Sequence, residues 1–240
     1  MKGRHAVSDE LYISSNKKNQ TVSNEHLTAI FAEVGRKYGY DDVTAEFCAF
    51  NDMKCRWQRS YRWIKFEVSD YLDRTPDHIL TELAENIFIR ISGGERDYSE
   101  TFIRYMNDNP GKEDNRRDFL KRYKLKDTSI GEFHDLNDSV NRLRDMNLIP
   151  RNLMCTLTWM DRGDSICMTS SVNMVASVNK ILDQKGVPEH VLDFAVYKAL
   201  CPLILGFPHH MMDPETQELI ESYPMYRESQ DWLWSHGMYT

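Results

Sequence analysis

Apolar residues recur every three to four positions in several stretches of the chain, a spacing that places them on one face of an α-helix. In the first half this spacing predicts a helix that begins after a Ser23 cap and stops at Gly39. A second helix follows a Thr75 cap with Pro76 in its first turn, and ends at Gly93–Gly94. In the second half the same spacing predicts helices over residues 131–146, 189–205, 214–223 and 228–234.

Strand signals are fewer. Apolar and polar residues alternate from Ile64 to Val68, as in a half-buried strand. Residues 152–159 and 165–175 also favour strands, and the turn at 161–164 between them predicts a hairpin. Residues 109–111, with the sequence Asn-Pro-Gly, are typical of a break between two helices. We find no internal repeat in this order of elements, which predicts an α+β fold rather than alternating βαβ units.

The distribution of these elements suggests three parts. Residues 1–20 are polar without an apolar period and predict a flexible tail. Residues 21–130 form a helix-rich half with a strand near 62–68, and residues 131–240 form the second half. The sequence leaves open whether the two halves make one continuous domain and whether residues 95–127 form a separate lobe.

Composition narrows the class of protein. Of the 240 residues, 41% are hydrophobic and 28% are charged, which is ordinary for a globular protein. The formal net charge of -7 disfavours a general phosphate-binding role. The most apolar segment, residues 191–207, is interrupted by Asp193, Lys198 and Pro202, so no membrane span is expected. The five cysteines lack CxxC spacing and predict free thiols, and we expect a cytoplasmic protein.

Three segments carry a family resemblance. The first runs from Ile64 to Leu72 and on through Thr75–Pro76 into the following helix, the second from Leu157 to Asp183, and the third from Val187 to Pro202. In order and local pattern they resemble the SprT-like, zincin-type metallopeptidases. The resemblance spans residues 60–235. It implies a zincin-like fold with a small β-sheet packed on helices, and it identifies residues 131–240 as a degenerate metallopeptidase half.

The family's third segment contains HExxH, in which two histidines four apart bind zinc and the glutamate acts as the base. The resemblance places Lys198 at the first histidine, Ala199 at the glutamate and Pro202 at the second histidine. Lysine is a cation, alanine has no proton acceptor and proline has no ligand atom. A third histidine of the family corresponds to Met212, although an offset of two or three residues would place His209 or His210 there.

The resemblance therefore implies a pseudoenzyme with no catalytic residues, no metal and no other cofactor. The leading prediction is a non-catalytic module that binds another protein or acts as a scaffold, with the former active-site groove as the first candidate binding surface. The candidate groove residues are Lys198, Cys201, His209 and His210.

Two other functions stay open. His209 and His210, with Cys201 and two methionines nearby, form a soft-metal cluster, so a metalloenzyme with a relocated site is the first alternative. Residues 54–65 interleave basic and aromatic side chains, a pattern that stacks bases and holds phosphates. The second alternative is therefore a DNA-associated module, disfavoured by the net charge, whose candidate contacts are Arg56, Trp57, Arg59 and Arg62.

Overall fold

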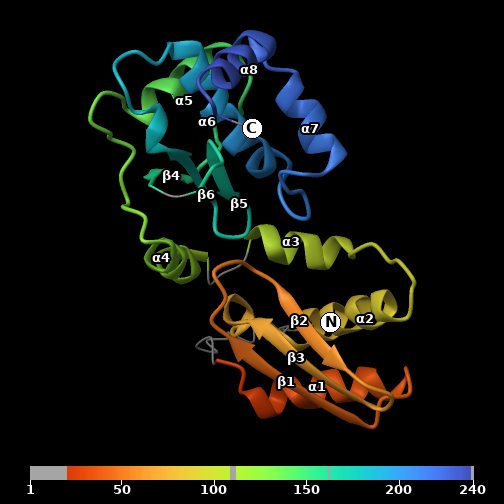
Figure 1. The fold of residues 1–240 in the computed structure, drawn as a ribbon. Helices are drawn as coiled ribbons and strands as arrows, with labels where there is room; N and C mark the ends of the chain where they lie inside the picture. The colour runs from red at the N-terminus through yellow and green to blue at the C-terminus, as the bar shows by residue number, and fades with distance from the viewer. Residues whose placement is uncertain (1–20, 109–111, 162, 239–240) are drawn as a thin grey trace, which may run out of the picture.

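The structure is a computed structural model that describes residues 21–108, 112–161 and 163–238. These residues form eight α-helices and two three-stranded sheets, which confirms the α+β class (Figure 1). The predicted tail at 1–20 and the predicted break at 109–111 lie outside the described residues. Within the described part of the chain, no helix is both long and apolar enough to cross a membrane.

The first unit begins with a helix whose boundaries agree with the sequence signals, because the Ser23 side chain accepts a hydrogen bond from the His26 N–H, and Gly39 has a positive φ. The strand order is β1-β3-β2, with β3 parallel to β1 and antiparallel to β2. The elements are α1 (Asn24–Arg36), β1 (Asp42–Cys48), β2 (Cys55–Arg59), β3 (Trp63–Ser69), the 3-10 turn η1 (Asp70–Leu72) and α2 (Asp77–Ile91).

The second unit has the same elements in the same order. Its sheet runs β4-β6-β5, with β6 parallel to β4 and antiparallel to β5. The elements are α5 (Leu136–Asp145), β4 (Thr156–Met160), β5 (Cys167–Ser170), β6 (Val175–Asn179), the 3-10 turn η2 (Lys180–Leu182) and α6 (Glu189–Leu205).

The two units are copies of one structural repeat, so the prediction that the chain has no internal repeat is wrong. The strand register is the same in both: Cys55 pairs with Val68 in the first unit, and Cys167 pairs with Val178 in the second. Each 3-10 turn is followed by an aspartate, and each long helix has a proline at its N-cap. Few residues are identical between the copies, so the shared topology is what reveals the repeat.

The predicted hairpin between residues 152–159 and 165–175 is also wrong. These segments contain β4 and β5, but β6 lies between them and pairs with both. β6 takes the centre because four of its five residues are buried and it needs a covered position on both faces. β4 and β5 are therefore the two edge strands of the sheet, and the hairpin is the one that joins β5 to β6.

Two helix starts differ from the predicted ones. Thr75 does not cap α2, because it is buried and its Oγ1 is hydrogen-bonded by the Tyr105 hydroxyl at 3.2 Å; the N-cap is Pro76. The helix expected from residue 131 begins at Leu136 instead. The backbone N–H groups of residues 132–134 donate to the Asp183 carboxylate, which holds this segment against η2 in a non-helical conformation.

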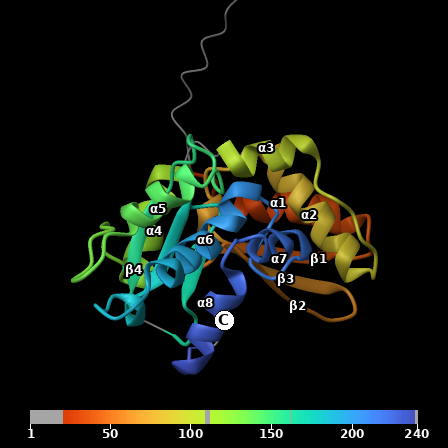
Figure 2. The ribbon, with the colours of Figure 1, turned by 90° about the horizontal axis from the view of Figure 1, so that it is seen from above.

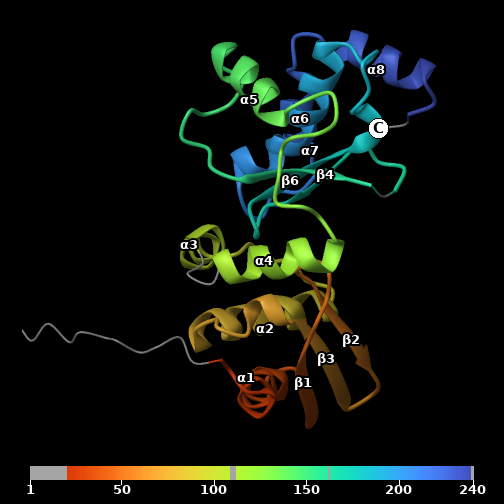
Figure 3. The same cartoon turned by 90° about the vertical axis from the view of Figure 1, so that its left-hand side faces the viewer.

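Two further helices, α3 (Glu100–Asp108) and α4 (Lys112–Tyr123), lie as a layer between the units (Figures 1 and 3). Phe102 of α3 belongs to the core of the first unit. Phe119 of α4 packs against Val175 of β6, on the face of the second sheet that is opposite α6. Both faces of the second sheet are therefore covered, whereas strands of the first sheet keep an exposed face.

The remaining helices, α7 (Pro214–Glu221) and α8 (Tyr226–Ser235), pack on α6 (Figure 2). Tyr197 of α6 donates its hydroxyl hydrogen bond to the Leu219 carbonyl at 3.1 Å. Leu233 of α8 is fully buried in the same core. α6 is consequently surrounded on all sides, which explains its nearly continuous apolar sequence.

Candidate functional site

The window that the family resemblance aligns with HExxH lies in the middle of α6 and is buried. Ala199 and Cys201 are fully covered, and Lys198 is only 9% exposed. Among the described residues Lys198 has no hydrogen-bond or ion-pair partner. Burial raises the pKa of the nearby Cys167 thiol to about 12, and the Lys198 charge opposes that rise. This window therefore places a lysine and one protonated thiol, that of Cys201, in the core, with the Cys167 thiol of β5 nearby.

The equivalent window of the first unit is found by counting from the proline that caps each helix. Lys198 follows Pro188 by ten residues, and Asn86 follows Pro76 by ten residues. Asn86 is 1% exposed, and neither its Oδ1 nor its Nδ2 has a hydrogen-bond partner. The next positions of that window are Ile87, which is buried, and Arg90, which is exposed. Neither copy of the repeat therefore has a zinc-binding motif on its long helix.

His209 and His210 line a groove between the two units, with a volume of about 670 Å³. Its wall includes Tyr98 and Phe207, whose ring centroids are 5.4 Å apart. Asn107 fixes the Phe207 backbone, because its Oδ1 accepts from the Phe207 N–H at 2.9 Å. The complete lining is Met53, Arg90, Tyr98, Phe207, Pro208, His209, His210, Asp213, Pro214 and Glu215.

The ring nitrogens of His209 face two carboxylates. Its Nδ1 is 3.5 Å from Asp213 Oδ1, and its Nε2 is 3.5 Å from Glu215 Oε2. Asp213 is also the N-cap of α7. Burial alone would raise the pKa of Asp213, but hydrogen bonds from the Thr216 hydroxyl, the Thr216 N–H and the His210 N–H outweigh it and lower this pKa. This carboxylate is ionised, and its oxygens already accept the hydrogen bonds that cap the N-terminus of α7.

The four residues expected to rim one groove are divided by the fold. His209 and His210 lie on the groove between the units, whereas the side chains of Lys198 and Cys201 are buried in the core of the second unit. Met212, the other position considered for a third zinc ligand, is 81% exposed, and its backbone N–H donates to His210 Nδ1.

Among the described residues, one group brings three possible metal ligands within 4.8 Å of one another, and it lies away from the histidines. It consists of Glu46, Cys48 and Glu67 on the first sheet. Lys65 Nζ lies 2.6 Å from Glu46 Oε1, and Arg56 Nη2 lies 2.9 Å from Glu67 Oε2. Burial, with the charges of Glu67 and Glu46, raises the pKa of the Cys48 thiol. Paired carboxylates beside a protonated thiol do not by themselves make a metal centre.

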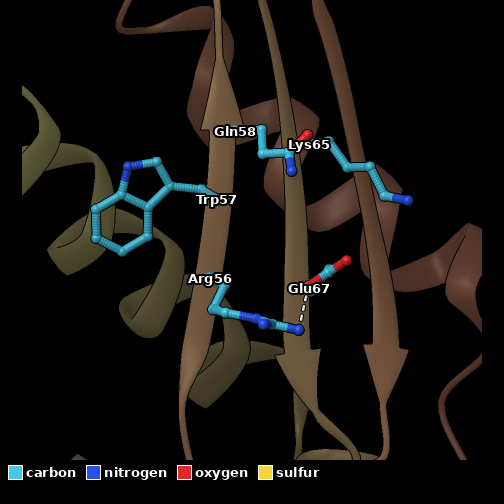
Figure 4. Close-up of a pocket in the computed structure, with 5 residues that line it drawn as sticks. All are labelled: Arg56, Trp57, Gln58, Lys65 and Glu67. Atoms are coloured by element: carbon cyan, nitrogen blue, oxygen red, sulfur yellow. Dashed lines mark ion pairs between the residues drawn. The ribbon is translucent and has the colours of Figure 1, made fainter.

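The basic and aromatic residues of 54–65 do not form one surface. In Figure 4 Arg56 and Gln58 point toward Lys65 and Glu67, whereas the Trp57 ring points out past the strand on the other side. Arg56 pairs with Glu67, and Arg62 pairs with Asp41. The hollow of about 220 Å³ at this strand is lined by Arg56, Trp57, Gln58, Lys65 and Glu67, and the Arg56 charge in it is already paired with Glu67.

No protein-family model matches this chain, and no curated protein or solved structure matches it. The SprT-like resemblance stays a prediction that rests on the quoted residues.

Sequence reasoning named only His209 and His210 among the residues of the groove, and it missed every residue that the first half of the chain contributes, which are Met53, Arg90 and Tyr98. They come from the loop before β2, the end of α2 and the segment before α3, while the histidines lie more than a hundred residues later. No local pattern marks such a set, because only the packing of α3 between the units brings its members together.

Proposed function

We propose that this chain is a non-catalytic, protein-binding module built from two degenerate zincin-like units. The observation that carries the proposal is that the long helix of each unit has non-ligating residues at the aligned positions. These are Asn86, Ile87 and Arg90 in α2, and Lys198, Ala199 and Pro202 in α6.

Burial strengthens the argument from residue type. A zinc site needs several lone pairs directed at one point, and a hydrolase needs that point open to water and substrate. Ala199 and its neighbours face the packed core of the second unit. A metal ion held at this position of α6 would therefore be closed off from substrate.

The groove between the units suits a polypeptide partner. Tyr98, Phe207 and Pro208 provide apolar and aromatic contact area, which is enriched at the centres of protein interfaces. Arg90 of the first unit supplies a cation, and Glu215 of the second supplies an anion. The overall charge of -7 favours a protein over a nucleic acid as the partner.

Elemental analysis of untagged protein purified without chelator tests the loss of the metal site. We expect zinc and other transition metals well below one ion per chain, together with no cleavage of casein. Replacing Lys198, Ala199 and Pro202 by His, Glu and His tests the fold, and zinc bound by that variant alone would support the zincin-like ancestry.

The rival with a specific observation in its favour is the metalloenzyme with a relocated site, because His209 lies between Asp213 and Glu215. One ion per chain in the native protein, lost when His209 and His210 are both replaced by alanine, would establish it and overturn our proposal. The DNA-associated module has less support, since two of its four candidate contacts are already ion-paired.

A further inference from the structure

β2 is an edge strand whose outer side carries free backbone groups. The Ser60 N–H donates to the Trp63 carbonyl at 3.0 Å, and the Ser69 N–H donates to the Lys54 carbonyl at 2.9 Å. In an antiparallel pair, such bonded positions alternate along the strand. The backbones of Arg56 and Gln58 therefore face β3. Those of Cys55, Trp57 and Arg59 face away from the sheet, and no described residue hydrogen-bonds to them.

Two other edges of the sheets are already satisfied by neighbouring side chains. On β1, Thr28 Oγ1 donates to the Ala45 carbonyl at 2.8 Å and accepts from its N–H at 2.9 Å. The Phe47 N–H donates to Asn24 Oδ1 at 2.9 Å. These contacts from α1 occupy both backbone groups of Ala45 and the N–H of Phe47, so α1 lies where another strand would pair with β1.

On β5, the counterpart of β2, Ser165 has the same effect. Its hydroxyl donates to the Cys167 carbonyl at 2.7 Å and accepts from the Cys167 N–H at 3.4 Å. Cys55 holds the position of Cys167 in the first unit, but the residue two before it is Met53, whose side chain cannot make these bonds. The two copies therefore differ at this edge: the outward groups of Cys167 on β5 are taken by Ser165, whereas those of Cys55 on β2 are open.

The surroundings of β2 are basic and partly unpaired. Lys54 Nζ lies 4.9 Å from the centre of the Phe50 ring, and Arg90 Cζ lies 5.8 Å from that of Tyr98. Arg59 donates to the Ile91 carbonyl at 3.3 Å. None of these three cations forms an ion pair with a described carboxylate. Lys54 lies beside the start of β2, Arg90 lines the groove between the units, and Arg59 lies at the end of β2.

We propose that the free edge of β2 binds an acidic, extended segment of a partner protein, which joins the first sheet as a fourth strand. Main-chain hydrogen bonds to Cys55, Trp57 and Arg59 provide the strand pairing. The unpaired cations Lys54, Arg59 and Arg90 favour a partner segment with negative charge. The ring of Trp57, 42% exposed, projects past the strand where an added strand lies (Figure 4). Met53 continues the surface into the groove between the units.

This inference rests on the proposed protein-binding function and names the partner's chemistry. The probe is a synthetic peptide of about eight residues that alternates threonine with glutamate, long enough for one ordinary strand. A peptide with lysine in place of glutamate is its control. We expect the acidic peptide to bind more tightly by at least about tenfold, with an affinity that falls as salt rises.

Trp57→Pro is the decisive variant, because proline removes an outward N–H and leaves the ladder to β3 intact. Trp57→Thr is its matched control, since it removes the ring and keeps the N–H. We expect Trp57→Pro to weaken binding by about tenfold more than Trp57→Thr. Slow amide exchange at Arg56 and Gln58 would verify that both variants keep the sheet.

A second measurement does not depend on a variant. In the wild-type protein, the acidic peptide should slow amide exchange at Cys55, Trp57 and Arg59 selectively. Equal binding of both peptides, no binding, or protection confined to the groove at His209 would overturn the proposal. So would tighter binding of oligothymidylate at these amides, or a dimer of this chain that Trp57→Pro dissolves. A metal-loaded, proteolytic protein would instead refute the proposed function and would not alter these exchange rates.

Discussion

Arg142 of α5 and Asp193 of α6 form a two-point ion pair that ties together the helices of the second unit. Arg142 Nε lies 2.8 Å from Asp193 Oδ2, and Nη2 lies 2.7 Å from Oδ1. The Asp193 side chain is 5% exposed, so its charge depends on this single partner for compensation. The contact explains how an aspartate is accommodated in the most apolar helix of the chain.

Arg142→Met should therefore lower the free energy of unfolding by about 3 kcal/mol, because it leaves the buried Asp193 carboxylate without its only ion-pair partner among the described residues. Urea unfolding followed by circular dichroism measures the change. The double variant Arg142→Met with Asp193→Leu should recover most of the loss, since an apolar pair of similar volume can replace a buried ion pair. A single variant as stable as the wild type would show that the pair contributes nothing.

Asn86→Leu should stabilise the protein by about 1 kcal/mol, because the buried amide of Asn86 has no hydrogen-bond partner and leucine is of similar size. A higher midpoint of thermal unfolding would confirm this. Asn137→Leu is the matched control: Asn137 is exposed and donates to Ser129 Oγ at 2.7 Å, so its replacement should give no stabilisation. If Asn86→Leu destabilises the protein instead, the amide is paired in solution.

Asp213 should make stability depend on pH in the acid range. Its pKa is lowered in the folded protein, so its contribution is fully present above the ordinary value of 3.8 and is lost as the pH falls toward the folded pKa. Asp213→Asn keeps a capping oxygen without the charge. Unfolding free energies measured from pH 6 downward should therefore fall less steeply below about pH 4 in the variant than in the wild type. Parallel curves would contradict the assignment.

The thiols should react slowly in the native protein. Burial raises the pKa of Cys55, Cys167 and Cys201 to about 12 in each case, and raises that of Cys155 to about 11. Little thiolate is then present at pH 7.5. Titration with a disulfide reagent should modify Cys48 first, and all five cysteines only in urea. A fast phase that persists in Cys48→Ser would show that a core thiol is accessible.

Local signals gave correct helix boundaries where the deciding contacts are local. Ser23 caps α1 through its own side chain, and Gly39 and Gly93 adopt positive φ beyond the ends of α1 and α2. Thr75 failed as a cap because a distant residue, Tyr105, takes its hydroxyl. Residues 131–135 failed as a helix because Asp183, some fifty residues later, accepts hydrogen bonds from the N–H groups of residues 132–134.

The candidate site divides in the same way. The sequence identified His209 and His210 as chemistry-bearing, and the structure places both on a groove. The sequence alone could not identify Arg90 or Tyr98 as groove residues, because their neighbours across the groove are more than a hundred residues away in the chain. Lys198 and Cys201 were expected beside the histidines, but the packing of α6 turns both into the core.

The sequence by itself determined the α+β class, the apolar character of α6 and the absence of an HExxH motif on it, since each depends on residue type and short-range periodicity. Only the tertiary structure decided that β6 separates β4 from β5, that the two units are copies, and that β2 is left with an open edge. Strand pairing joins residues that are distant in the chain, and its hydrogen bonds use backbone groups that every residue has. The choice of partner therefore depends on which faces and edges the rest of the fold covers.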